Sequence, residues 1–238
     1  MSSTLLIAGL VLTLGGIVQG VIGFGLALVA APVLALIAPE LLPAPLLLAV
    51  LVHTVLTMVR EREHVDWHGV GWAMVGRLPG TAAGILVVDA LPQRAFFVVV
   101  GGGVLAFTAL SMLSWRPRPT PQALVTAGVV SGAFGTAMAI GGPPVALLYQ
   151  HEHGARIRST LSAYFLLGAL VSVAGLTMAG HLDGRDAASA AVLVPFLLAG
   201  FALSGPARRL VAGGRIRYAV VGLAGLSALA LIGRSLFG

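Results

Sequence analysis

Long apolar runs separated by short polar loops occupy almost the whole chain. Two of them, residues 4–38 and 123–149, are longer than the rest, and three runs of ordinary length follow each. These shorter runs are residues 41–59, 70–88, 96–113, 161–179, 187–203 and 218–237. A helix needs about 20 apolar residues to cross a bilayer, so the pattern predicts an all-α polytopic membrane protein.

The first long run exceeds the length of a single crossing. Its 35 residues would form a straight helix of about 52 Å. The glycine-rich centre of the run and Pro32 offer places where a helix can break. We therefore expect a broken or hairpin helical run here and again at residues 123–149.

The composition indicates that the solvent of this protein is a bilayer. Hydrophobic residues make up 58% of the 238 residues and charged residues 9%, against about 25% in soluble domains. The absence of cysteine excludes disulfides, thiolate catalysis and cysteine-ligated metals. The net charge of +6 comes from arginines that lie mostly in short loops, which is typical of membrane topology and does not indicate nucleic-acid binding.

The centre of the first long run recurs in the second. Residues 16–33 and 128–145 agree at 7 of 18 positions, including glycines spaced Gly-x3-Gly-x2-Gly and a proline nine residues after the third glycine. Such a registered match predicts an internal duplication. The predicted repeats are residues 1–115 and 123–238, joined by a Pro/Arg linker at residues 116–122.

The arginines in the loops indicate how the two repeats are oriented. If each long run crosses the membrane once, six loop arginines lie on one face and seven on the other. If each run enters and leaves on the same face, the distribution becomes ten against three, the bias expected of cytoplasmic loops. This predicts two inverted repeats in a bacterial inner membrane, with both termini periplasmic; a cytoplasmic C-terminal reporter would contradict it.

Inverted repeats with broken helices that meet at the midplane are a transporter architecture. Irregular backbone at that depth must line a protein cavity, and amides at the start of a half-helix favour an anion. The alternative is that the glycines only allow close helix packing, which leaves the run lengths and the arginine bias unexplained. The candidate substrate-binding residues in the two breaks are Gln19, Gly20, Gly23, Phe24, Gly25, Ser131, Gly132, Gly135, Thr136, Gly141, Gly142 and Pro143.

Two ionisable residues inside apolar runs are added to this set. His53 would sense or carry a proton, or it would be a neutral histidine hydrogen-bonded to a neighbouring helix. Arg77, just before Pro79, would attract the anion, or its side chain would reach back to the headgroups.

Two histidine-containing segments suggest a metal site at first sight. His151-Glu152-His153 lacks the spacing of a helical zinc motif, and His64 and His68 lie in a charged turn. We interpret both as solvated loops and expect neither a metal nor a cofactor.

At the two glycine-rich segments the sequence resembles the sulfite exporter TauE/SafE family. The resemblance rests on G-x-x-Q-G-x-x-G-F-G-x-A-x-x-A-x-P at residues 16–32 and G-x-x-x-G-x-x-G-x-x-x-x-x-G-G-P-P at residues 128–144. It implies transport of small sulfur-containing anions, such as sulfite or organosulfonates. One departure is His53, which stands where the family pattern leads us to expect an asparagine, and the equivalent second-half position lies near Gly168.

These observations predict a secondary transporter that moves a small anion by alternating access between the two broken runs. A passive anion channel on the same fold is the alternative. An intramembrane enzyme would need carboxylates, a Ser/His pair or a metal set, whereas the apolar runs hold no Asp or Glu. The expected partners are the anion, the lipid bilayer and a coupling proton, with no nucleic acid; homo-oligomerisation and a role as a subunit serving another protein stay open.

Overall fold

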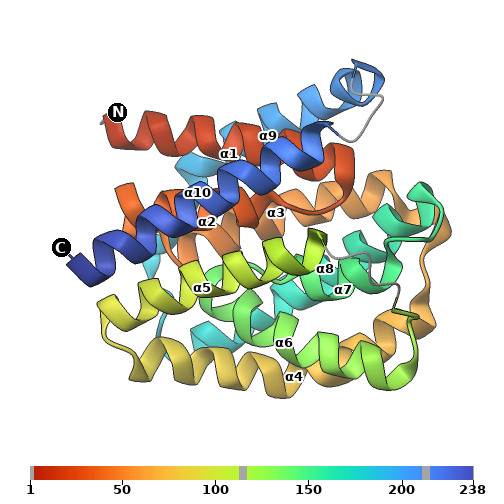
Figure 1. Cartoon of the computed structure of the whole chain (residues 1–238), viewed down its shortest axis with the longest axis horizontal. Coiled ribbons are helices and arrows are strands. Elements are labelled where there is room, and N and C mark those ends of the chain that lie inside the picture. The colour runs from red at the N-terminus through yellow and green to blue at the C-terminus, as the bar shows by residue number, and fades with distance from the viewer. Residues whose placement is uncertain (1–2, 113–116, 211–214, 238) are drawn as a thin grey trace.

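The computed structural model describes residues 3–112, 117–210 and 215–237, and in these ranges the chain is all-helical (Figure 1). The predicted boundary between the first repeat and the linker, at residues 115 and 116, lies outside them. The α-helices are α1 (Ser3–Ile22), α2 (Leu26–Ile37), α3 (Ala44–Arg60), α4 (Trp67–Ala90), α5 (Gln93–Met112), α6 (Pro121–Met138), α7 (Gly142–Tyr149), α8 (Gly154–Met178), α9 (Gly184–Leu210) and α10 (Arg215–Phe237). Short 3-10 helices, η1 (Pro39–Leu41) and η2 (Arg62–His64), precede and follow α3.

Five helices of the described chain are long and apolar enough to cross a membrane. They are Thr4–Ile22, Trp67–Ala90, Gln93–Leu110, Gly154–Met178 and Gly184–Ala207. Large apolar side chains cover the outside of the bundle, for example Leu10, Leu86 and Leu226. An apolar exterior of this kind requires lipid around it, so the protein is a multi-pass membrane protein, as the sequence pattern predicts.

Both long runs break at their glycine-rich centres. The chain leaves α1 through Gly23 (φ 100°) and Gly25 (φ 117°) and leaves α6 through Ala139 (φ 60°). Backbone with φ in this range is strained for residues that carry a Cβ, which explains the two glycines after α1.

The first run turns back on itself after its break. A Cβ added at Gly15 would lie 3.2 Å from the Leu26 carbonyl oxygen. Ala8 and Leu12 of α1 share one buried cluster with Ala30 and Leu34 of α2. The first run is therefore two helices that fold back on each other rather than one straight helix.

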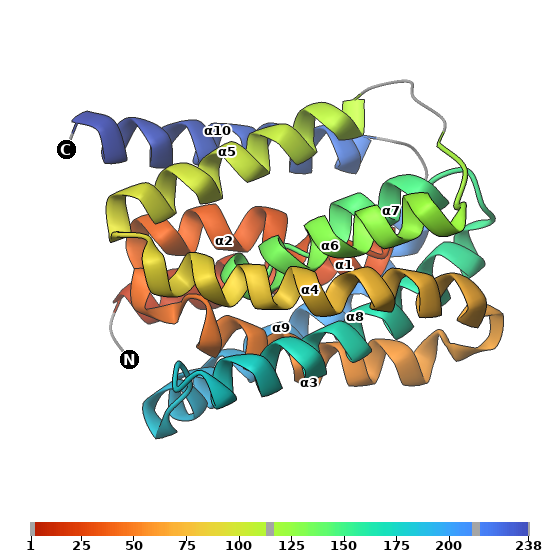
Figure 2. The same ribbon diagram turned by 90° about the horizontal axis from the view of Figure 1, so that it is seen from below.

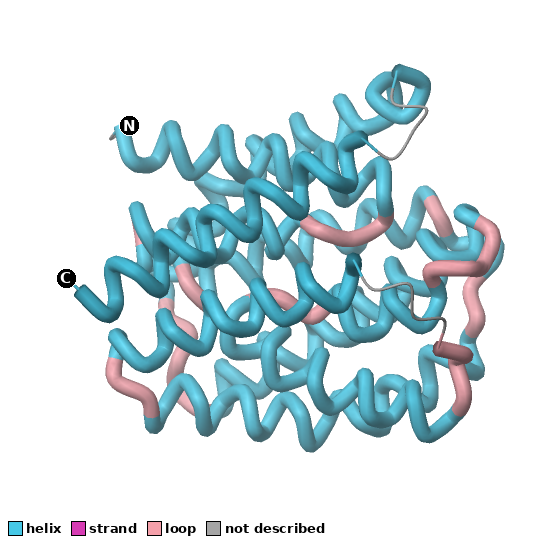
Figure 3. The backbone as a smooth tube through the Cα atoms, in the orientation of Figure 1, coloured by secondary structure: helices cyan, strands magenta, loops and turns pink. Residues whose placement is uncertain are grey.

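The ends of the elements gather at the two ends of the bundle. Figures 1 and 2 show that both chain termini lie at the same end, and Figure 3 shows most loops at one end or the other. At the opposite end from the termini, the turn after α3 meets the start of α8, where Asp66 contacts Thr160 and Glu61 contacts Arg158.

Glycines let two pairs of helices pack with their backbones in contact. Along α4 and α6, Gly76 meets the Val125 carbonyl and Gly128 meets the Ala73 carbonyl, so no side chain would fit at either glycine. Along α1 and α9, Gly16 meets the backbone of Gly200. Membrane helices often associate through small residues that allow close packing. Some of the glycines in this chain serve this packing.

Candidate functional site

A small cavity of about 40 Å³ lies where the breaks of the two long runs meet. By volume it has room for about three water molecules or one small oxyanion. Its lining includes seven of the predicted site residues: Gln19, Gly25, Arg77, Gly135, Gly141, Gly142 and Pro143. The structure thus brings both glycine-rich segments and Arg77 to one point inside the membrane-spanning bundle.

Among the described residues that line this cavity, Arg77 is the charged one. It lies in the middle of α4 and is only 3% exposed, so its side chain points into the protein rather than back to the headgroups. Its Nη1 donates to Ser131 Oγ at 3.3 Å and to Tyr164 Oη at 3.2 Å, and its Nη2 donates to Ser172 Oγ at 3.2 Å. Its Cζ also lies 5.2 Å from the centre of the Tyr164 ring.

The Arg77 guanidinium has no anionic partner in the described part of the chain. Its contacts are to neutral hydroxyls and a ring, and its Nε is buried without a hydrogen-bond acceptor among the described residues. A buried charge without a counter-charge is costly, and in a membrane span such a residue indicates function.

Three glycines leave the space that the guanidinium occupies. A Cβ at Gly135 would lie 2.9 Å from Nη2, and a Cβ at Gly141 would lie 3.0 Å from Nη1. A Cβ at Gly168 would lie 2.8 Å from Nη1 and would overlap Cζ and Nε. The space beside Gly168, near the second-half equivalent of His53, is therefore filled by Arg77 from another helix.

Tyr164 and Ser172 hold the Arg77 side chain, and the sequence reasoning missed both. With Gly168 they are spaced four residues apart along α8, so all three lie on one face of the helix, and that face meets Arg77. The recurrence of polar or small residues every fourth position in an apolar run is a signal that could have found them.

Hydroxyl groups connect Arg77 to the second break. Ser131 Oγ accepts from Arg77 and donates to the Gly141 carbonyl, which fixes the loop between α6 and α7. Thr136 Oγ1 lies 2.8 Å from Ser172 Oγ, so it supports a hydroxyl that itself holds the guanidinium.

The first break is held by Gln19 and touches the second. Gln19 Oε1 accepts from the Leu26 amide at 3.3 Å, which satisfies one free amide at the start of α2. A Cβ at Gly142 would lie 3.3 Å from the Phe24 Cβ, so the two breaks are in direct contact. The predicted residues Gly20 and Gly132 instead pack against helices, Gly20 against Ser204 of α9.

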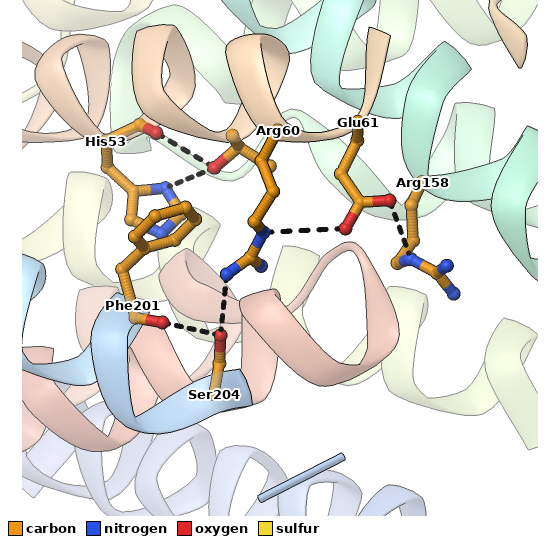
Figure 4. Close-up of polar contacts among 7 residues, drawn as sticks. His53, Arg60, Glu61, Arg158, Phe201 and Ser204 are labelled. Carbon is orange, nitrogen blue, oxygen red and sulfur yellow. Dashed lines mark hydrogen bonds and ion pairs between the residues drawn. The ribbon is translucent and has the colours of Figure 1, made fainter. Parts of the chain in front are cut away.

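His53 lies apart from the cavity, on the side of α3 that faces α9. It is fully buried, its ring meets Phe201 edge-on at 5.5 Å, and its Nε2 has no hydrogen-bond partner within the described residues. Figure 4 shows how the same region continues into a row of polar contacts. The contacts are Arg60 Nη1 to Ser204 Oγ at 3.3 Å, Arg60 Nε to Glu61 at 3.5 Å and Arg158 Nε to Glu61 at 3.1 Å. His53 thus lies beside this row, against Phe201, and does not line the cavity.

Asp66 organises the turn before α4. Its Oδ1 accepts from the Gly69 amide at 3.0 Å and caps the helix, while its Oδ2 accepts from Tyr149 Oη at 2.9 Å. Partial burial raises the pKa of Asp66, but these two hydrogen bonds and Arg156, 3.5 Å away, outweigh it and hold the pKa below its usual range. The nearby His68 accepts from Trp72 Nε1, so these residues of the charged turn have structural partners.

Residues 7–231 match the family model described as Sulfite exporter TauE/SafE. A relative from Cupriavidus necator, named Probable sulfite/organosulfonate exporter TauE, is 27% identical over 196 residues, which cover 76% of this chain and 75% of the relative. No solved structure matches the chain.

Proposed function

The chain belongs to the sulfite exporter TauE/SafE family, and we propose that it is a secondary transporter that moves a small sulfur-containing anion through the cavity between the two broken runs. The family and the exporter name of the relative favour transport rather than an enzymatic reaction. The observation that carries the proposal is the Arg77 guanidinium, which is buried at the cavity without an anionic partner among the residues that the structure describes.

A transported anion would supply the negative counter-charge that Arg77 lacks within the described chain. An Arg guanidinium presents several donors in a planar fork that matches an oxyanion. Arg77 Nε is a donor that finds no acceptor among the described residues. Binding the anion would thus neutralise a buried charge, and the absence of a permanent carboxylate partner leaves the site free again once the anion has gone.

Two helix N-termini reinforce the attraction for an anion. α2 begins at Leu26 and α7 begins at Gly142, and both residues line the cavity. Each helix start carries roughly half a positive charge. In α7 the two residues after Gly142 are prolines, so that helix offers fewer amide donors than α2 and contributes mainly through its dipole.

Reciprocal packing between the halves supports inverted repeats and alternating access. The first helix of each half packs on the fourth helix of the other: α1 on α9, and α6 on α4. Opposed units of this kind transport by rocking against each other around a fixed site. The cavity, formed from both breaks, would then face each side of the membrane in turn.

The proposed orientation has both termini in the periplasm and the arginine-rich loops in the cytoplasm. Both termini lie at one end of the bundle, and Arg60 and Arg158 lie together at the other. Five further arginines of the predicted cytoplasmic set have side chains outside the described part of the chain: Arg116, Arg208, Arg209, Arg215 and Arg217.

Flux measurements in proteoliposomes test the proposal. A carrier gives saturable sulfite uptake that is accelerated by sulfite inside the vesicles. Arg77→Gln should abolish this flux, whereas Arg62→Gln, the same change at an exposed residue of η2, should preserve it. Uptake that never saturates, together with ionic conductance, would favour the channel instead, and no sulfite flux in the wild type would refute the sulfur assignment.

A further inference from the structure

We infer that the transported anion carries no cationic group, so that the site takes simple oxyanions and alkylsulfonates and rejects aminosulfonates. This inference rests on the proposed function and concerns the same cavity. It follows from a count of charges around the site, from the state of its polar groups and from the fixed position of Arg77.

No carboxylate is available to meet an ammonium group in the cavity. Arg77 is the one charged side chain among the lining residues of the described chain. All eight acidic residues of the sequence lie outside the lining: Glu40, Glu61, Glu63, Asp66, Asp89, Glu152, Asp183 and Asp186. A substrate ammonium would therefore enter a site whose only full charge has the same sign.

Two neutral acceptors at the site are already engaged. Gln19 Oε1 accepts from the Leu26 amide, and the Gly141 carbonyl accepts from Ser131. The walls contributed by α3 and α8 are apolar: Leu47, Val50, Phe165 and Ala169. An ammonium group has three donors to satisfy, and a site of this kind would leave them buried without acceptors.

Hydrogen bonds hold Arg77 where it would repel a substrate ammonium. Three hydroxyls from α6 and α8 hold its two terminal nitrogens, and Gly168 lies against the face of the guanidinium. Phe165 is the lining group that would attract a cation through its ring. One ring does not offset a full like charge in the same small cavity, because like charges a few ångströms apart in protein repel strongly.

A matched pair of probes separates charge from size. 2-Hydroxyethanesulfonate and 2-aminoethanesulfonate differ in one terminal group of similar volume, which is neutral in the first and an ammonium at pH 7 in the second. Both would be titrated as competitors of labelled sulfite for the wild-type protein in detergent. We expect the amino compound to compete roughly tenfold more weakly or worse, a difference of about 1.4 kcal/mol for each factor of ten.

The outcomes of this titration are distinguishable. Equal competition by both sulfonates would overturn the inference and leave the proposed function standing. Failure of both sulfonates while unlabelled sulfite competes would overturn it too, because size and not charge would then set the limit. Absence of saturable sulfite binding would instead contradict the proposed function itself.

Discussion

Adding one methyl group at position 168 should displace Arg77 without removing any charged or polar atom. In the wild type Gly168 lies flat against the guanidinium, and a Cβ there would overlap Cζ and Nε. The backbone of α8 is packed on both α3 and α4, so the helix cannot withdraw. In Gly168→Ala the guanidinium must therefore leave the place where Ser131, Tyr164 and Ser172 hold it.

The size of the effect follows from the contacts that are lost. A hydrogen bond with a charged partner contributes about 1.5–3 kcal/mol, so losing one such bond to the oxyanion weakens binding roughly 10- to 150-fold. Overpacking of a filled interior lowers the stability by a further amount of about 1–3 kcal/mol. We therefore expect both a weaker sulfite affinity and a lower unfolding midpoint.

The assay is calorimetric titration of sulfite into purified wild-type and variant protein, with unfolding followed in parallel. Gly71→Ala is the matched control, because Gly71 lies on the same helix as Arg77 and a Cβ there meets nothing within 4 Å. The control should bind as the wild type does. If the sulfite affinity of Gly168→Ala were within about twofold of the wild-type affinity, the position of the Arg77 guanidinium would not matter for anion binding.

Three further predictions concern other parts of the molecule. Asp66→Asn should lower the unfolding midpoint at neutral pH. Because the pKa of Asp66 is depressed in the folded state, the difference in midpoint between variant and wild type should disappear as the pH falls below about 4 and through that lowered pKa. A difference in midpoint that does not depend on pH would contradict this. Because the chain has no cysteine, a membrane-impermeant maleimide added to intact cells should label Gly184→Cys and not His64→Cys, and the reverse pattern would invert the proposed orientation. His53→Ala should cost about 2–5 kcal/mol of stability, as other large-to-small changes at buried sites do, yet leave sulfite affinity unchanged in the same titration; weaker binding would return His53 to the site.

The sequence predicted the helical membrane fold and the two breaks because their signals are local. Apolar run length reports crossings directly, and the positions of Gly23 and Gly25 report backbone that other residues avoid. The structure accordingly ends α1 before Gly23 and ends α6 before Ala139.

The surroundings of Arg77 could not be predicted in the same way. Its partners come from α6 and α8, at sequence separations of 54, 87 and 95 residues, and a serine or tyrosine in an apolar run does not reveal which helix it faces. For the same reason the sequence could not tell an inward Arg77 from one that reaches the headgroups, or place His53 between α3 and α9.

The central claim, that the anion binds beside Arg77 between the starts of α2 and α7, is tested most directly by locating a bound anion. Selenite is a sulfite analogue with an anomalous scatterer, and the chain has no thiol for it to oxidise. A crystal grown with selenite should show one selenium peak within hydrogen-bonding distance of the Arg77 guanidinium, and the peak should be absent in Arg77→Gln. A selenium peak at the Arg60 and Arg158 end of the bundle, with nothing beside Arg77, would contradict the account.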